Sequence, residues 1–268
     1  MPKNFKNKVA VFIDYDGTLY DHNQGKVHDE VIELLKIAKE SKKVDIYLTT
    51  GRPMVYLKYK SNILENLKGI ISANGSCIEI DNNNILDVSI DKENLENLFN
   101  YSNMNNISIL FFGKNNVYIN FKDEELTKKF TTNNEYPIFI IDDFYEIKDE
   151  VNQVCVFASN EVIDKMKLNF KGLEIYKWGY SGGDIVLKGI SKGNAIKKVI
   201  EINDYEFENT FGIGDGENDI PMFKSVFNSV AMGNAKEETK MHSKEVTDSI
   251  ENRGLEKILE KIIKLTSF

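Results

Sequence analysis

Two carboxylates one residue apart, Asp14 and Asp16, follow directly on the apolar run Val9-Ala10-Val11-Phe12-Ile13. A run of this kind, bounded by lysine before it and by Asp and Gly after it, predicts a buried strand that ends abruptly. In parallel sheets the chemistry collects at the carboxyl ends of strands. The pair therefore predicts a phosphoryl-transfer centre with one carboxylate as nucleophile, the other as acid/base, and a metal ion between carboxylate and phosphate. An ordinary polar turn explains these residues equally well, so partners at other strand ends must decide.

Polar side chains suited to phosphate chemistry follow the ends of three other predicted elements. In chain order they are Thr50, Lys192, Asp215, Asn218 and Asp219. Since the ends of parallel strands meet at one edge of a sheet, we expect these groups to meet the first two carboxylates there.

A divalent cation fits this set of oxygen ligands. Held by Asp14 and Asp215, with the backbone carbonyl of Asp16 as a further ligand, it would offset the repulsion between a carboxylate and a phosphate dianion. Magnesium suits such a site because it accepts one or two carboxylates, waters and phosphate oxygens. Lys192 and the hydroxyl of Thr50 would supply charge and a hydrogen-bond donor to the transferring phosphoryl group.

Each of these residues also has a simpler interpretation. Thr50 is a normal helix-capping residue, and Lys192 fits a solvated first helical turn. Gly214-Asp215-Gly216 fits a turn, and Asp219 fits a helix cap. A dinucleotide-binding loop is excluded because Glu217 stands where the third glycine belongs and no N-terminal βαβ unit precedes the segment.

Strand and helix patterns alternate in the first part of the chain and again near its end. Apolar residues within 31–38 recur at helical spacing, and strands are predicted at 45–49 and 69–72. Strands separated by helices of this length imply a parallel sheet with right-handed connections. The same pattern resumes with a strand at 184–187 and finishes with a helix at 255–265.

Between these two parts the pattern changes to hairpins and separate helices. Hairpin turns are predicted at 81–84 and 113–116. The predicted fold class is therefore α/β: a Rossmann-like parallel-sheet core formed by residues 1–81 and 184–268, interrupted by an inserted α+β domain at 82–183.

The composition of the chain argues against some classes of binding partner. The net charge is −8 with no basic stripe, which argues against nucleic acid. No segment approaches the roughly 20 apolar residues that span a bilayer, and no long apolar segment follows the charged start. Cys77 and Cys155 form no C-x-x-C pair, so we expect reduced thiols. These features predict a cytoplasmic protein without nucleic-acid or membrane partners, and they leave the oligomeric state unknown.

In this combination and order, the residues resemble the haloacid dehalogenase-like (HAD-like) superfamily of phosphatases, in particular its Cof-type group with an inserted type IIB cap domain. Four motifs carry the resemblance: Asp14-Tyr15-Asp16-Gly17-Thr18, Thr50-Gly51-Arg52-Pro53, Lys192-Gly193 and Gly214-Asp215-Gly216-Glu217-Asn218-Asp219. Two accessory segments also match, Asn74-Gly75 and Ala231-Met232-Gly233-Asn234-Ala235.

The resemblance implies a role for each matched residue. Asp14 is the nucleophile and Asp16 the acid/base. The implied phosphate-binding residues are Thr50, Gly51, Lys192 and Asn218. The implied magnesium ligands are Asp14, Asp16 and Asp215. The implied supporting residues are Asp219, Gly17 and Asn74. The family also implies that the cap closes over the site and reads the leaving group.

The predicted function is a magnesium-dependent phosphatase that hydrolyses a small phosphorylated metabolite, most commonly a sugar phosphate in this family, through an aspartyl-phosphate. The alternative is a sugar phosphomutase, which must grip a second phosphate, usually with a bidentate arginine. Residues 82–183 contain no arginine, which favours the phosphatase. A non-enzymatic phosphate-binding protein is disfavoured by the intact Asp14 and Asp16. A receiver-type module would need neither the insertion nor Asp16.

Overall fold

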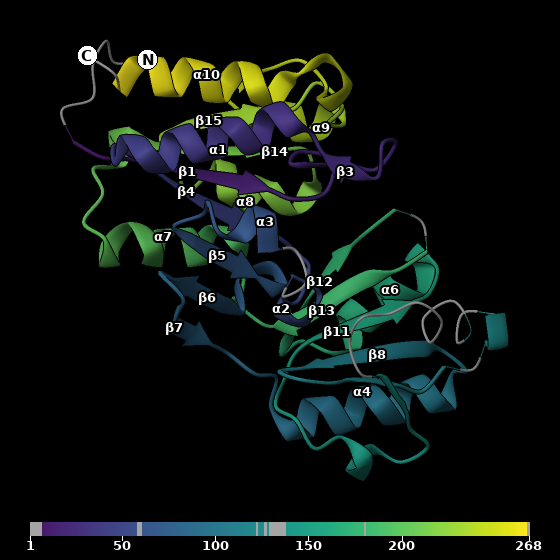
Figure 1. Ribbon diagram of the computed structural model, residues 1–268. Helices are drawn as coiled ribbons and strands as arrows, with labels where there is room; N and C mark the ends of the chain where they lie inside the picture. The colour runs from purple at the N-terminus through teal and green to yellow at the C-terminus, as the bar shows by residue number, and fades with distance from the viewer. Residues whose placement is uncertain are drawn as a thin grey trace. The chain divides into compact units, whose positions relative to one another are not determined.

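The computed structural model describes residues 7–57, 61–121, 123–125, 128, 138–179 and 181–266. The chain forms two compact units (Figure 1). The first unit comprises residues 1–50, 60–85 and 191–268, and the second comprises residues 51–59 and 86–190. None of the helices in the described ranges combines the length and hydropathy needed to traverse a bilayer.

The first unit is built on an eight-stranded sheet. In spatial order its strands are β16 (Glu245–Val246), β15 (Asn228–Ala231), β14 (Thr210–Gly214), β1 (Val9–Asp14), β4 (Val44–Thr49), β5 (Gly69–Ser72), β6 (Cys77–Ile80) and β7 (Asn83–Asp87). The strands from β16 to β5 all pair in parallel. A separate two-stranded hairpin, β2 (Tyr20–Asp21) with β3 (Lys26–Val27), follows β1. The predicted parallel core with interleaved helices is confirmed.

Helices cover both sides of this sheet. α1 (Asp29–Ser41) packs against α10 (Gly254–Thr266) on one side, and α7 (Lys192–Ile202) packs with α8 (Ile220–Phe223) on the other (Figure 1). The shorter helical segments of the unit are α3 (Ser61–Leu64), α9 (Glu237–Lys240) and the 3-10 turns η1 (Ala73–Gly75), η3 (Phe207–Asn209), η4 (Glu217–Asp219) and η5 (Ile250–Asn252).

The central strand β1 is buried along its whole length. A parallel strand covered on both faces needs a continuous apolar run, which Val9–Ile13 supplies. Asp14 is the last residue of the strand, so the apolar run carries its carboxylate to the carboxyl edge of the sheet.

The edge of the sheet beyond β5 differs from the sequence prediction. The strand after the turn at 81–84 was expected to open the inserted domain, but it forms β7, which lies beside β6 in the first sheet. β6 runs antiparallel to β5, with Gly69 opposite Ile80, so the sheet is mixed and not wholly parallel. The tight connection through Ala73–Gly75 reverses the chain at once, which a crossover helix cannot do.

The second unit is a six-stranded sheet with α4 (Lys92–Met104) and α6 (Asn160–Asn169) on one face and the short helix α2 (Met54–Leu57) on the other. In spatial order its strands are β10 (Ile138–Ile140), β9 (Val117–Ile119), β8 (Ser108–Gly113), β11 (Val151–Phe157), β13 (Gly183–Leu187) and β12 (Leu173–Lys177). Its helical segments also include the 3-10 turn η2 (Phe144–Glu146). Asp91 caps α4 by accepting from the Asn94 amide, as its position before the apolar pattern predicts.

Alternation along the strands gives this sheet two different faces. Ile109 and Phe111 of β8 pack with α4 and α6 in the larger core cluster. Leu110 and Phe112 point to the opposite face, where they pack with Val55 of α2.

The strand predicted at 184–187 was assigned to the wrong sheet. It is β13, which pairs antiparallel with both β11 and β12 in the second unit. Its apolar residues stand just before the capped start of α7, so the segment resembles a strand–helix step of a parallel core. The antiparallel register with β12, Leu173 opposite Leu187, instead makes the two strands a hairpin.

Leu98→Ala should destabilise the second unit by about 2–5 kcal/mol, because Leu98 is fully buried in its core and truncation leaves a cavity. Leu168→Ala is the matched control, since Leu168 is 73% exposed on α6 of the same unit, and it should change the free energy of unfolding little. Urea unfolding followed by circular dichroism measures both. Equal effects of the two variants would contradict the assignment of Leu98 to the core.

Candidate active site

A sharp loop follows β1 and carries the two sequence-predicted carboxylates. Asp14 is 6% exposed, and Asp16 begins the turn that leads into the β2–β3 hairpin. Gly17 in this turn has φ +76°. A Cβ there would lie 2.4 Å from an Asp215 carboxylate oxygen, so only glycine allows the loop to lie this close to Asp215.

A buried lysine links two carboxylates at the centre of the site. Lys192 Nζ donates to Asp14 Oδ1 at 2.5 Å and to Asp219 Oδ1 at 2.6 Å, and its side chain is fully buried. The lysine is the first residue of α7, whose preceding residue Ser191 caps the helix by accepting from the Asn194 amide. The solvated first-turn position considered from sequence is therefore wrong for Lys192.

Asp219 serves this site with both carboxylate oxygens. While Oδ1 accepts from Lys192, Oδ2 accepts from the backbone amides of Asp215 and Gly216 at 3.0 and 2.9 Å. Asp219 thus holds the lysine and shapes the loop after β14 at the same time.

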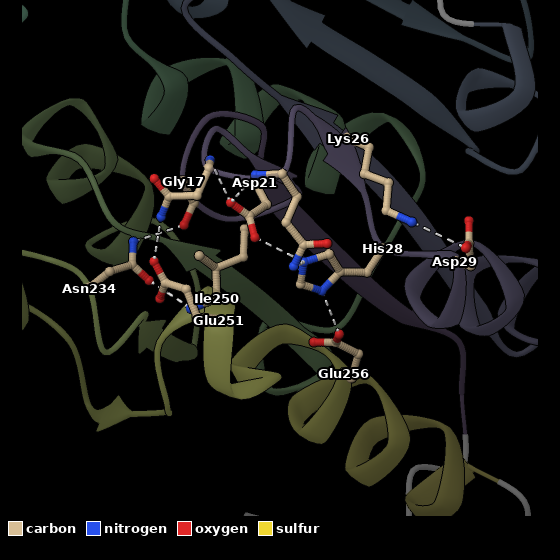
Figure 2. A network of polar contacts seen from close by, with 11 residues as sticks. Gly17, Asp21, Lys26, His28, Asp29, Asn234, Ile250, Glu251 and Glu256 are labelled. Carbon is tan, nitrogen blue, oxygen red and sulfur yellow. Dashed lines mark hydrogen bonds and ion pairs between the residues drawn. The ribbon is translucent and has the colours of Figure 1, made fainter.

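Asp215 faces the loop after β1. Its Oδ1 accepts from the Thr18 hydroxyl at 3.0 Å. Asn234 Nδ2 lies 2.9 Å from the Gly17 carbonyl oxygen and 3.3 Å from Asp215 Oδ2, and Figure 2 shows it beside Gly17. Sequence motifs placed Asn234 in an accessory segment without a role, and these contacts assign it one: it ties the two loops together.

The carboxylates of the cluster repel one another, and this repulsion changes their pKa values. Burial raises the pKa of Asp14 well above its usual range, and the nearby charge of Asp219 adds to this while Lys192 opposes it. Burial and the charge of Asp219 also raise the pKa of Asp215 to about 6. Burial lowers the pKa of Lys192, but Asp14 and Asp219 outweigh it, so the lysine stays charged.

The cluster has the composition of a divalent-cation site. Ligand oxygens of Asp14, Asp215 and Asp219 all lie within 4.8 Å of one another. Three carboxylates and one ammonium leave two negative charges uncompensated in a largely buried place, which is the charge that a hard divalent cation neutralises. Asp219 is engaged by the Lys192 ammonium and by two backbone amides, whereas Asp215 accepts from the side chains of Thr18 and Asn234.

Asp16 takes a different position from these three. Its side chain is 39% exposed, and His22 Nε2 lies 2.9 Å from its Oδ1. Its carboxylate is not among the clustered oxygens of the described residues, so a ligand role of Asp16 in this geometry falls to its backbone carbonyl. Nothing in the sequence spacing of His22 indicates this contact with Asp16.

Thr50, Asn74 and Asn218 form a second group in the first unit. The Thr50 carbonyl accepts from the Asn74 amide at 3.0 Å, and Asn218 Nδ2 donates to Asn74 Oδ1 at 3.1 Å. Asn74 is fully buried at φ +53°, a left-handed conformation that asparagine tolerates better than most residues. Gly51, the residue after Thr50, belongs to the second unit.

The chain matches the family model of haloacid dehalogenase-like hydrolases over residues 11–259. It belongs to this family. A 5-amino-6-(5-phospho-D-ribitylamino)uracil phosphatase of Bacillus subtilis, YcsE, is 28% identical over 250 residues, covering 93% of each chain. A phosphoglycolate phosphatase of Methanobrevibacter smithii is 23% identical over 267 residues, covering 96% of this chain and 99% of the relative.

Solved structures give the same answer. The structure of the HAD subclass IIB sugar phosphatase BT4131 superposes on this chain with a TM-score of 0.84 at 27% sequence identity, covering 95% of this chain and 98% of that one. The resemblance to this superfamily is thus confirmed, and this HAD-like chain is a phosphatase, a phosphoric monoester hydrolase.

Asp219→Ala should lower the free energy of unfolding by about 3–5 kcal/mol, because it leaves the buried Lys192 ammonium short of a partner and two loop amides without an acceptor. Asp164→Ala is the matched control: it removes an aspartate that pairs with Lys177 at 2.6 Å on the surface and should cost less than about 1 kcal/mol. Urea titration measures both. A loss no larger for Asp219→Ala than for the control would contradict the buried-pair assignment.

Stabilisation by Mg²⁺ should depend on pH because of Asp215. Between its ordinary pKa of 3.8 and about 6, the folded protein holds a proton on Asp215 that the unfolded chain has lost, so this group's contribution to stability falls as pH rises. Above pH 6 the Asp215 carboxylate is ionised, so a bound cation stabilises the folded protein most there. Thermal unfolding with and without Mg²⁺ should therefore show a larger increase in Tm at pH 8 than at pH 5, with NaCl of equal ionic strength as control. Equal increases would contradict this account.

Proposed function

We propose that this HAD-like phosphatase hydrolyses a sugar phosphate or a similar small phosphate monoester through an aspartyl-phosphate on Asp14, with Mg²⁺ as cofactor. The observation that carries the proposal is the buried cluster in which Lys192 bridges Asp14 and Asp219 beside Asp215. A structural ion pair needs one carboxylate, whereas phosphoryl transfer needs a nucleophile, a cation for the phosphate charge and a held lysine.

In the first step, an oxygen of Asp14 attacks phosphorus and the ester bond to the leaving oxygen breaks. Lys192 is within 2.5 Å of the same carboxylate, so its charge lies where the three phosphoryl oxygens must come. Asp16, two residues further along the loop, donates its proton to the departing alkoxide.

In the second step, water attacks the aspartyl-phosphate. Asp16, now a carboxylate, takes the proton of the attacking water, the acyl-phosphate bond breaks, and inorganic phosphate leaves with Asp14 restored. The two carboxylates differ in their partners: Lys192 pairs with Asp14 and favours its ionised, nucleophilic form, whereas Asp16 lies partly exposed beside His22.

Mg²⁺ would be held by Asp14, Asp215 and the Asp16 carbonyl, and when bound it supplies Lewis-acid charge to the phosphoryl oxygens. Thr50, Gly51 and Asn218 are proposed to bind the phosphate. Three further residues are proposed to support the site. Asp219 holds Lys192, and Gly17 allows the close approach to Asp215. Asn74 accepts a hydrogen bond from Asn218.

The second unit is proposed to act as the cap that selects the leaving group. The structural similarity to a subclass IIB sugar phosphatase supports a sugar phosphate as the substrate class. The stretch from 82 to 183 predicted as the inserted domain lies mostly within this unit, and it holds no arginine that would grip a second phosphate.

Asp14→Asn should abolish release of inorganic phosphate from sugar phosphates and from p-nitrophenyl phosphate, because an amide oxygen cannot form the phosphoenzyme. Asp16→Asn should slow turnover by a factor of about 10²–10⁴ through loss of the general acid. Asp29→Asn, on an exposed side chain of α1, is the matched control and should keep full activity. EDTA should abolish the wild-type activity and excess Mg²⁺ should restore it.

Full activity in Asp14→Asn would contradict the nucleophile assignment, and activity that survives EDTA would contradict the magnesium proposal. Phosphate release should be tested across a panel of phosphorylated metabolites. Faster formation of a sugar-phosphate isomer than of free phosphate would favour a phosphomutase.

A further inference from the structure

A histidine outside the active site lies between two buried carboxylates. His28 Nε2 is 3.1 Å from Asp21 Oδ2, and His28 Nδ1 is 3.0 Å from Glu256 Oε1 (Figure 2). Asp21 and Glu256 are each 1% exposed. Asp21 belongs to the β2–β3 hairpin and Glu256 to α10, so the imidazole of His28 joins two elements far apart in the sequence.

The geometry requires a protonated ring. Both ring nitrogens face carboxylate oxygens, and only an imidazolium donates from both. Although burial opposes it, the contacts with Glu256 and Asp21 raise the pKa of His28 above 6.5. Burial is likewise outweighed at Asp21, where hydrogen bonds from His28 and from the Gln24 and Asn23 amides lower the pKa.

The contacts of His28 with Asp21 and Glu256 form a bridge, and this bridge has a second arrangement when the ring loses a proton. The side-chain nitrogen of Gln24, Nε2, lies 3.3 Å from His28 Nε2 and can donate to it once His28 Nε2 is deprotonated. Asp21 Oδ2 then loses its donor and faces a lone pair. Glu256 already has one buried oxygen, Oε2, without a hydrogen-bond partner among the described residues, so this pocket has no spare donors to absorb the change.

Both elements joined by His28 are connected to Gly17 in the catalytic loop. On the hairpin side, the Gly17 amide donates to the Tyr20 carbonyl at 3.1 Å, next to Asp21. On the other side, the amide of Ile250 in η5, the 3-10 turn that precedes α10, donates to Asn234 Oδ1 at 3.0 Å, and Asn234 donates to the Gly17 carbonyl at 2.9 Å (Figure 2). The Gly17 amide is thus held by the hairpin, and the Gly17 carbonyl by Asn234, which η5 holds in place just before α10.

We propose that His28 is a positioning residue: as an imidazolium between Asp21 and Glu256 it fastens the β2–β3 hairpin to α10, and so holds the Asp16–Gly17 turn in its active geometry. Deprotonation of His28 then releases the turn and lowers activity on the alkaline side. This inference rests on the proposed phosphatase function of the turn.

Other charged side chains near the bridge have partners of their own. Lys26 of the hairpin pairs with Asp29 of α1, and Asn23 donates to Glu251 of η5. Arg253, just before α10, pairs with Glu260, and Lys257 of α10 pairs with Asp248, while Glu30 of α1 is exposed. In the described part of the chain, Asp21 and Glu256 are the charged groups paired with the imidazole.

The test is the pH profile of kcat/KM together with NMR titration of the histidines. The chain has three histidines, so their ring signals can be assigned with single His→Gln variants. We expect His28 to be doubly protonated at pH 6 and the alkaline fall in wild-type activity to coincide with its titration. Glu256→Gln removes one of the two negative charges and should move both midpoints down by about 1 pH unit.

Asp21→Asn should give the same downward shift, and it serves as the second variant where Glu256→Gln does not fold. His242→Gln, on an exposed histidine, is the control and should leave the profile unchanged. A neutral His28 at pH 6, or an activity profile that stays in place while the His28 titration moves, would overturn the proposal.

Amide hydrogen exchange separates this inference from the proposed function. Exchange of residues 15–21, corrected for the intrinsic effect of pH, should accelerate as His28 deprotonates, and at lower pH in Glu256→Gln. An enzyme inactive on every phosphate ester with this exchange pattern would refute the proposed function and keep the bridge. Unchanged exchange across the titration would refute the bridge, whatever the activity.

Discussion

The site depends on one buried charge, the ammonium of Lys192. Burying an ammonium is costly unless carboxylates surround it, and Asp14 and Asp219 do so at hydrogen-bond distance. These two carboxylates come from the end of β1 and from η4, while the lysine opens α7. The energetic demand of a single side chain therefore fixes the relative positions of three elements.

The same demand explains why the loops around it have so little freedom. One oxygen of Asp219 is fixed by its ion pair with Lys192, and the other oxygen holds the loop after β14 through two backbone amides. That loop presents Asp215, which in turn requires glycine at position 17. The constraint passes from the buried ion pair to the catalytic turn through direct contacts.

Much of the first unit could be predicted because its signals are local. β1, β5 and β15 lie where apolar runs end in Gly, Asp or Ser, and the motif residues after β1 and β14 come together as the parallel topology requires. β13 was placed in the wrong sheet because a short apolar run before a helix cap looks the same in either sheet, and only pairing with β12 decides. His28 and Glu256 could not be connected from sequence, since 228 residues separate them and neither has motif spacing.

The division of the chain into units has a consequence for the chemistry. The chain passes from the first unit to the second immediately after Thr50, and its last return to the first unit is at Ser191, one residue before Lys192. Two groups proposed to hold the phosphate are thus covalently next to the points where the units join. A change of backbone torsion at either junction therefore occurs at, or next to, a residue proposed to hold the phosphate.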